Sequence, residues 1–120
     1  MGLPVPLNIA VVDRHELMRL CFENLLRDWP FGRITLLAAD GAAVEAACAA
    51  GTPIHLAIVA VHPPDHEGLL TLRSLLSLLP DLVPVAYLHT EDPLVVRRAM
   101  RFGARSVWTL TTAAREVLHS

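Results

Sequence analysis

The sequence predicts an α/β domain in which helices cover both faces of a parallel sheet. Short apolar runs alternate with segments of helical spacing along the 120 residues, which gives five predicted strands and five predicted helices. This alternation requires crossover connections, and these favour parallel pairing and a three-layer sandwich. The first, third and fourth runs are nearly all apolar, which is typical of strands buried on both faces.

The first strand is predicted at Leu7–Val12, where the residues are apolar and partly β-branched. A helix follows at His15–Asp28, because its apolar residues recur every three or four positions. The segment Trp29–Gly32 contains proline and glycine and ends that helix. The second strand is predicted at Ile34–Ala38.

The second helix is bounded by residues that favour its two ends. Asp40 is a good N-cap, the helix runs through Ala50, and Gly51 ends it. The third strand is predicted at Leu56–Val61 and leads into a loop that contains two prolines.

The third helix is predicted from about Glu67 to Leu79 and is ended by Pro80. Its leucines cover more of the helix surface than one core face requires. The helix therefore either contributes to an interface or is well buried. The fourth strand is predicted at Leu82–Leu88.

An Asp-Pro pair opens the fourth helix, which is predicted at Asp92–Phe102 with Gly103 as its stop. The fifth strand is predicted at Ser106–Leu110. Thr111 or Thr112 then caps a short last helix. With no linker or repeat, the chain is predicted to be one domain, residues 1–120.

Composition narrows the class of protein. The chain is 53% hydrophobic and has a formal net charge of -2, which gives no strong electrostatic footprint for nucleic acid. No apolar run is long enough to span a bilayer, and no secretion signal is evident, so we expect a cytoplasmic protein. Cys21 and Cys48 have unrelated spacing, which favours reduced core thiols over a disulfide or a metal clip.

In open parallel sheets, ligand sites form at the carboxyl ends of the strands, where the strand order reverses. Candidate site residues are therefore those at or just beyond the predicted strand ends. They are Asp13, Arg14, His15, Ala60, His62, Leu88, His89 and Leu110.

Two of these strand ends resemble the receiver domains of bacterial response regulators. The segment Asp13–His15 is similar to the family's acidic pair after the first strand, with Arg14 in place of the second acid. The loop after the third strand is similar to the phosphorylation loop. Pro64 and Gly68 match it, but Ala60 occupies the position of the aspartate that accepts the phosphoryl group.

Counting from the Gly-Ala pair before the fifth strand extends the resemblance. Leu88 then stands at the position of a threonine or serine, and Leu110 at that of a lysine. The family's aromatic switch position is Val107, with Trp108 beside it. The resemblance covers essentially the whole chain and is strongest to receivers of NarL/LuxR-type transcription regulators.

The resemblance implies a (βα)5 flavodoxin/CheY-like sheet with strand order 2-1-3-4-5. It also implies a chemistry for which this chain lacks the groups, because phosphoryl transfer needs a carboxylate nucleophile and a magnesium ion. Four of five expected functional groups are replaced, at Arg14, Ala60, Leu88 and Leu110. We therefore expect no enzyme and no cofactor, with the three apolar replacements lining a smaller and more apolar pocket.

Asp13 remains in this altered pocket. A buried unpaired carboxylate is costly, so we expect it to have a partner, Arg14 or His15. Histidines at three strand ends (His15, His62 and His89) raise the alternative of a zinc site. The resemblance already accounts for His15, and we expect no metal.

These observations predict a phosphorylation-independent pseudo-receiver, a regulatory and dimerisation module of an atypical response regulator that controls transcription. Such receivers normally precede a helix-turn-helix domain, which this chain does not contain. The alternative is a sensor that binds an apolar small molecule in the degenerate pocket. Trp108 is either an interface anchor or a partly buried sheet residue. The residues predicted for the dimer or partner face are Arg97, Arg101, Trp108 and Arg115.

Overall fold

The computed structural model describes residues 6–62 and 67–109. Five parallel strands form one sheet in the order β2-β1-β3-β4-β5. The elements are β1 (Leu7–Val12), α1 (Glu16–Leu26), β2 (Gly32–Ala38), α2 (Gly41–Ala49), β3 (Leu56–Val61), α3 (Glu67–Leu78), β4 (Val83–Leu88), α4 (Pro93–Arg101) and β5 (Ser106–Thr109). The predicted fold class and strand order are confirmed, while the predicted last helix lies outside the described residues.

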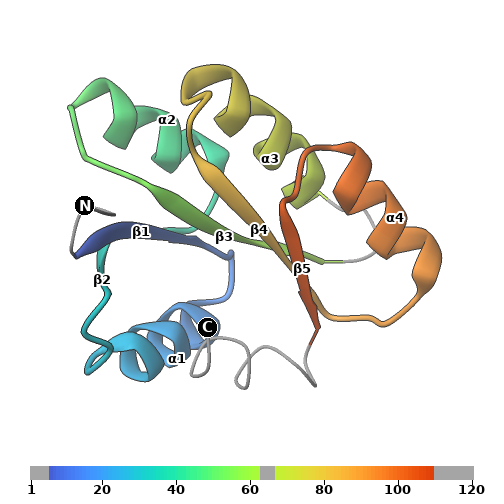
Figure 1. The fold of residues 1–120 in the computed structure, drawn as a ribbon, viewed down its shortest axis with the longest axis horizontal. Coiled ribbons are helices and arrows are strands. Elements are labelled where there is room, and N and C mark those ends of the chain that lie inside the picture. Colours follow the sequence, from blue (N-terminus) through green and yellow to red (C-terminus); the bar gives the residue numbers. More distant parts are fainter. Residues whose placement is uncertain (1–5, 63–66, 110–120) are drawn as a thin grey trace.

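The four helices of the described residues lie on both faces of the sheet. Figure 1 shows α1 on one face and α2, α3 and α4 on the other. The strand order reverses beside β1, because the chain passes from β1 out to β2 and returns to β3 on the other side of β1. The carboxyl ends of β1 and β3 therefore meet at the switch point where doubly wound sheets bind ligands.

Local signals set the ends of α2 and α4 as predicted. The carboxylate of Asp40 accepts the N–H of Ala43, and that of Asp92 accepts the N–H of Leu94, both at 2.9 Å. Gly51 and Gly103 follow the two helices with φ of 88° and 114°. At this left-handed position a glycine closes the helix with little strain, since it has no Cβ.

The second strand begins two residues earlier than predicted. Gly32 belongs to β2 and pairs with Leu7 of β1, although the sequence suggested only a helix stop at this position. A Cβ at Gly32 would lie 2.8 Å from both the Ile9 side chain and the Trp29 ring. The glycine is thus needed for close packing beneath the sheet, a tertiary constraint that local turn chemistry does not reveal.

Side chains alternate between two core clusters, one on each face of the sheet. The larger cluster joins β1, β3 and β4 to Val44 of α2, Leu72 of α3 and Ala99 of α4. The smaller cluster joins the opposite side of the same strands to Phe22 and Leu26 of α1. In the described ranges, 6–62 and 67–109, no helix is long and apolar enough to cross a membrane.

The leucines of α3 divide between core and surface. Leu69, Leu72 and Leu75 are buried, as the helical spacing of one core face requires. Leu70 and Leu78 are 60% and 49% exposed. The helix is therefore not buried all round, and its extra leucines lie on the surface of this chain.

Gly68, the second residue of α3, packs directly against the end of β3. A Cβ at this position would collide with the carbonyl oxygen of Ala60, which cannot rotate away as a side chain can. Exposed Gly→Ala changes in helices are normally stabilising by roughly 1 kcal/mol. We expect Gly68→Ala to reverse this sign and to lower the free energy of unfolding by about 1–3 kcal/mol.

Urea unfolding measures this change, and Gly41→Ala is the matched control. Gly41 opens α2, and its added Cβ would meet only the side chain of Thr71, with the hydroxyl oxygen at 3.2 Å. The control should therefore change stability much less. A Gly68→Ala variant as stable as the original chain would show that α3 can move away from β3 at no cost.

Candidate functional site

Three strand ends place polar side chains on the α1 side of the sheet. In each of these strands, the last side chain that belongs to the smaller core cluster is followed two positions later by a polar residue. Side chains two positions apart along a strand lie on the same face of the sheet. These pairs are Val11 and Asp13, Ala60 and His62, and Tyr87 and His89. The carboxyl edge of β1, β3 and β4 thus carries one carboxylate and two imidazoles side by side.

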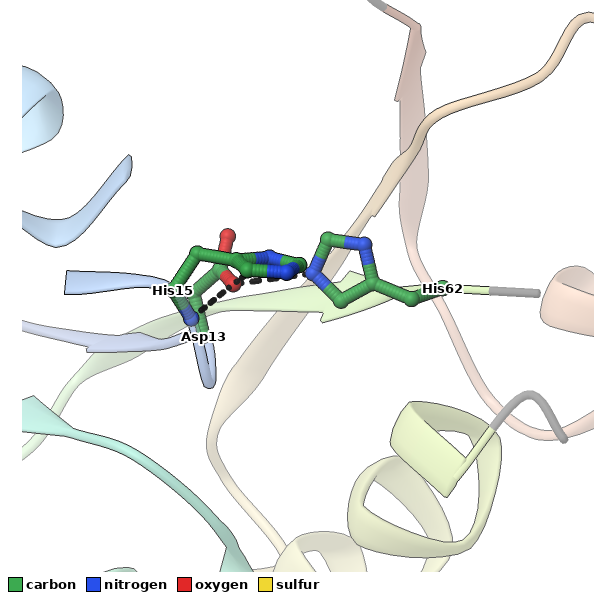
Figure 2. A group of neighbouring side chains, drawn as sticks. All are labelled: Asp13, His15 and His62. Carbon is green, nitrogen blue, oxygen red and sulfur yellow. Dashed lines mark hydrogen bonds and ion pairs between the residues drawn. The ribbon is translucent and has the colours of Figure 1, made fainter. Parts of the chain in front are cut away.

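Asp13 is the centre of this group and is only 3% exposed. Its Oδ1 accepts a hydrogen bond from Nε2 of His62 at 2.8 Å and another from the backbone N–H of His15 at 2.9 Å. Nδ1 of His15 lies 3.3 Å from the same oxygen. Figure 2 shows the two imidazoles converging on this one carboxylate.

The predicted partner of Asp13 is confirmed in His15, and His62 is a second partner that the sequence analysis did not predict. Arg14 is exposed, and within the described part of the chain it makes no ion pair with Asp13. The turn after β1 instead brings His15 back to the carboxylate. The alternation of side chains along β3 was the signal for His62, since it continues the face of Ala60.

The histidines also contact one another. The ring of His62 lies 4.5 Å from that of His15 and 4.2 Å from that of His89, centroid to centroid. His89 also contacts the ring of Tyr87 at 5.1 Å. Two buried atoms in this cluster, Oδ2 of Asp13 and Nε2 of His89, have no hydrogen-bond partner among the residues that the structure describes. Such atoms carry a desolvation cost that a ligand can relieve.

The environment shifts the ionisation of two groups at this edge. Burial, reinforced by the nearby His62, lowers the pKa of His89 below its usual value, while Asp13 opposes the shift. Burial also raises the pKa of Tyr87 above 10.0, and the charge of Asp13 adds to this effect. Neutral forms are thus favoured at both positions.

A cavity of about 20 Å³ opens beside the cluster. Asp13, Arg14, Ala60 and His62 line it, together with Asp40, the N-cap of α2, and Glu67 and Gly68 of α3. This space holds roughly one water molecule. Charged groups and an imidazole therefore share the lining with Ala60 and the apolar side chains of Val12 and Val59.

Leu88 does not line this cavity, which corrects the prediction that groups it with Ala60. It pairs with Val61 in the sheet and is fully buried in the larger core cluster, on the face that α2, α3 and α4 cover. The neighbour of Ala60 in β4 is Tyr87, on the opposite face from Leu88. Leu110, the third apolar replacement, lies outside the described residues.

The groups around Asp13 do not fit the magnesium ion that the receiver resemblance implies. Magnesium takes oxygen ligands in octahedral geometry, whereas imidazoles surround this carboxylate and Arg14 adds positive charge to the cavity lining. Asp40 also lines the cavity, but its Oδ1 accepts the N–H of Ala43 as the cap of α2. We therefore assign no magnesium-dependent step to this site.

The other predicted residues that the structure describes lie on β5 and α4. Val107 and Trp108 of β5 are partly buried and pack against the larger and the smaller core cluster respectively. Trp108 is therefore a partly buried sheet residue. Arg97 and Arg101 are exposed on α4, while Arg115 lies outside the described residues.

Comparison with solved structures identifies the fold. The RcsB response regulator of Salmonella typhimurium superposes with a TM-score of 0.82 over 96% of this chain, at 13% identity. A LuxR-family response regulator from Aurantimonas sp. SI85-9A1 gives 0.81 over 94%, at 18% identity. A CheY-like receiver domain protein from Methanospirillum hungatei JF-1 gives 0.77 over 94%, at 17% identity.

The fold is that of a response-regulator receiver domain. The matched region spans 57% of the Salmonella protein, 80% of the Aurantimonas protein and 88% of the Methanospirillum protein. Neither a protein-family model nor a curated protein matches the sequence. The receiver fold is therefore established by its three-dimensional structure, at a level of sequence identity too low to carry function with it.

The pair of Asp13 and His62 should be energetically coupled. His62→Ala leaves the buried carboxylate with the contacts of His15 alone, so it should lower stability by about 1–3 kcal/mol. In a double-mutant cycle with Asp13→Ala, we expect a coupling energy of similar size. Chemical unfolding in the presence of a chelator measures it without interference from metal ions.

His55 provides the control for this cycle. It lies before β3 at the opposite edge of the sheet, where its Nδ1 accepts the N–H of Asn8 at 2.9 Å. The effects of Asp13→Ala and His55→Ala should simply add. Equal coupling in both cycles, or none between Asp13 and His62, would contradict the assigned hydrogen bond.

The raised pKa of Tyr87 gives a prediction for alkaline pH. Because the folded pKa lies above the unfolded value of 10.0, the stabilising contribution is complete below pH 10 and is lost as pH rises through the folded pKa. Tyr87 is the only tyrosine, so tyrosinate absorbance follows it alone. The midpoint should be higher in the native chain than in denaturant, and Tyr87→Phe should abolish the signal. An equal or lower native midpoint would contradict the shift.

Proposed function

We propose that this chain is a pseudo-receiver, a regulatory domain whose output does not depend on phosphorylation. The observation that carries the proposal is what stands at the expected acceptor position, Ala60, and at the neighbouring acidic position, Asp13. A methyl group, that of Ala60, stands where the acceptor carboxylate is expected, and the neighbouring carboxylate of Asp13 is hydrogen-bonded to His62. Imidazoles contact this carboxylate, whereas the magnesium ion of phosphoryl transfer prefers oxygen ligands.

The composition supports the same conclusion. The ten basic residues of the chain are all arginines, so no lysine is present at any position. The lysine ammonium that the resemblance implies in the receiver site thus has no candidate in this chain. We propose a non-enzymatic role, because nucleophile, second acid and ammonium are missing together.

We further propose that the chain serves a transcription regulator in the cytoplasm. The support is structural similarity to a LuxR-family response regulator and to Salmonella RcsB, which has been solved bound to the promoter rprA. The described elements form a single receiver-like unit. Contact with DNA would require a separate domain, since this unit has no strong positive charge.

The proposed dimer face includes α4. Arg97 and Arg101 lie one turn apart on this helix and are exposed, and Leu94 and Met100 on the same helix are 64% and 52% exposed. Exposed apolar side chains beside arginine are characteristic of interfaces. Trp108 and Arg115 complete the set of residues that we propose for a homodimer or partner face.

An apolar-ligand sensor is the weaker alternative. It requires a cavity beside Ala60 large enough for a small molecule, and typical ligand sites have volumes of roughly 300–1,000 Å³. The cavity at this position measures about 20 Å³ and is lined by charged groups. The observed cavity counts against this function.

Two measurements on the same protein test the proposal. After incubation with acetyl phosphate and magnesium, the intact mass should show no added phosphate, and Ala60→Asp should not restore labelling because Arg14 and the missing lysine remain. Sedimentation velocity across a concentration series should show a dimer that the phosphate mimic beryllium fluoride leaves unchanged. An ordinary receiver domain serves as the positive control for both reagents.

The outcomes separate the two parts of the proposal. Arg97→Glu with Arg101→Glu should weaken the dimer by at least roughly tenfold if α4 forms the interface, as hot-spot substitutions do. Stoichiometric phosphorylation of the unmodified chain would overturn phosphorylation independence. A monomer at the highest concentration would overturn dimerisation.

A further inference from the structure

The Asp13 cluster has the donor spacing of a metal site. Among the residues that the structure describes, one group of three metal-ligating side chains has its donor atoms within 4.8 Å of one another, and it consists of Asp13, His15 and His62. These residues come from the end of β1, the turn before α1 and the end of β3. The chain therefore brings them together only by folding.

We propose that Asp13, His15 and His62 bind a divalent late first-row transition metal, with zinc as the representative ion. The carboxylate and the two imidazoles would supply three ligands, and a water molecule from the cavity that Asp13 and His62 line would supply a fourth. This inference goes beyond the proposed function, and it does not depend on dimerisation or on control of transcription.

The unpartnered oxygen of Asp13 points independently to a cation. Its side chain is 1% exposed, and within the described part of the chain its buried Oδ2 has no hydrogen-bond partner, although Oδ1 has two. A buried carboxylate oxygen in this state carries a substantial desolvation cost. Coordination of a cation would relieve that cost, which the two hydrogen bonds to Oδ1 do not.

The donor set selects the kind of metal. Two imidazole nitrogens and one carboxylate suit zinc and its neighbours, and catalytic zinc sites commonly combine three protein ligands with one open position. Magnesium and calcium prefer oxygen ligands throughout. The proposed site thus differs in chemistry from the magnesium site of receiver domains, although it uses one of the same positions.

The donor nitrogens of both histidines already lie close to Oδ1 of the Asp13 carboxylate, and one donor atom from each of the three residues lies within 4.8 Å of the others. Ligand atoms about 2.0–2.1 Å from a tetrahedral zinc ion lie roughly 3.3 Å apart. Nδ1 of His15 is already 3.3 Å from Oδ1 of Asp13, and Nε2 of His62 is 2.8 Å from it. Metal binding requires the proton of His62 to move from Nε2 to Nδ1 or to leave, so that the Nε2 lone pair is free.

Two features make the ligands reachable. The side chain of His15 is 53% exposed, so this ligand is accessible from solvent, whereas the side chain of Asp13 is 1% exposed. The cavity that Asp13 and His62 line has room for one water molecule. His89 lies outside the three-ligand set, but its ring is 4.2 Å from that of His62, and its buried Nε2 has no hydrogen-bond partner among the described residues.

Isothermal titration of the tag-free chain with zinc chloride tests the proposal directly. We expect one ion per chain, and we expect His62→Gln or His15→Ala to weaken binding at least tenfold, since even outer-shell substitutions at metal sites cost 10–100-fold. His62→Gln keeps a side-chain amide that can donate to Asp13, so it separates metal binding from folding. Circular dichroism confirms that each variant is folded.

His55→Asn is the matched control, because it removes a histidine at the opposite edge of the sheet and should leave the affinity unchanged. Cobalt absorption spectra test for sulfur ligands, since Cys21 is exposed and thiolates bind zinc. Sulfur-to-cobalt charge transfer, or affinity unaffected by His62→Gln and His15→Ala together, would overturn the site. Absence of zinc binding, or equally tight magnesium binding, would overturn it as well.

Failure of the zinc proposal can be distinguished from failure of the proposed pseudo-receiver function. A chain that binds no zinc can still be a phosphorylation-independent dimer, and a chain that accepts phosphate can still bind zinc. His89→Ala reports the coordination number, because a fourth imidazole ligand would make this variant at least tenfold weaker, whereas a water ligand predicts a smaller change.

Discussion

The burial of the Asp13 carboxylate at the end of the central strand is the constraint on which the carboxyl edge of this sheet depends. The backbone of Asp13 donates its N–H to Ala38 of β2 at 3.0 Å, and its carbonyl accepts from Arg19 of α1 at 2.7 Å. Its side chain accepts from His62 of β3 and from the N–H of His15. Asp13 thus connects the ends of β1, β2 and β3 with α1. Because a buried carboxylate is costly without partners, its hydrogen bonds hold these elements in fixed relative positions.

The elements of the fold were predictable because their signals are local. Asp40 and Asp92 cap their helices, and Gly51 and Gly103 close them, each through contacts within a few residues. The start of β2 was not predictable in this way. Gly32 is set by its closeness to Ile9 and to Trp29, and Ile9 becomes its neighbour only when β1 and β2 pair.

The site was only partly predictable for a related reason. Matching positions to the receiver pattern led to Asp13 and His15, which contact each other, and to Ala60, which lines the cavity beside Asp13. It identified Leu88 by count alone, without regard to the face of the sheet on which Leu88 lies. Side-chain alternation places Leu88 in the core opposite Ala60 and places His89 on the side of Ala60. The same alternation brings His62 to Asp13. Counting along a family motif places a residue along a strand. The alternation of side chains between the two faces of the sheet decides which way that residue points.

The cluster also differs in kind from a site that has simply lost its reactive groups. If a rigid apolar edge were sufficient, hydrocarbon in place of Asp13 and His62 would be at least as stable, since buried polar pairs seldom outweigh well-packed apolar residues. Instead the chain combines the methyl group of Ala60 with the Asp13 carboxylate and the His89 imidazole. Over residues 6–62 and 67–109, Oδ2 of Asp13 and Nε2 of His89 have no hydrogen-bond partner. Two unsatisfied ligand atoms in one buried cluster are costly for a purely structural edge. A bound cation would satisfy at least the carboxylate oxygen, and it would tie β1 to β3 at the position where a receiver domain joins its acids and its acceptor.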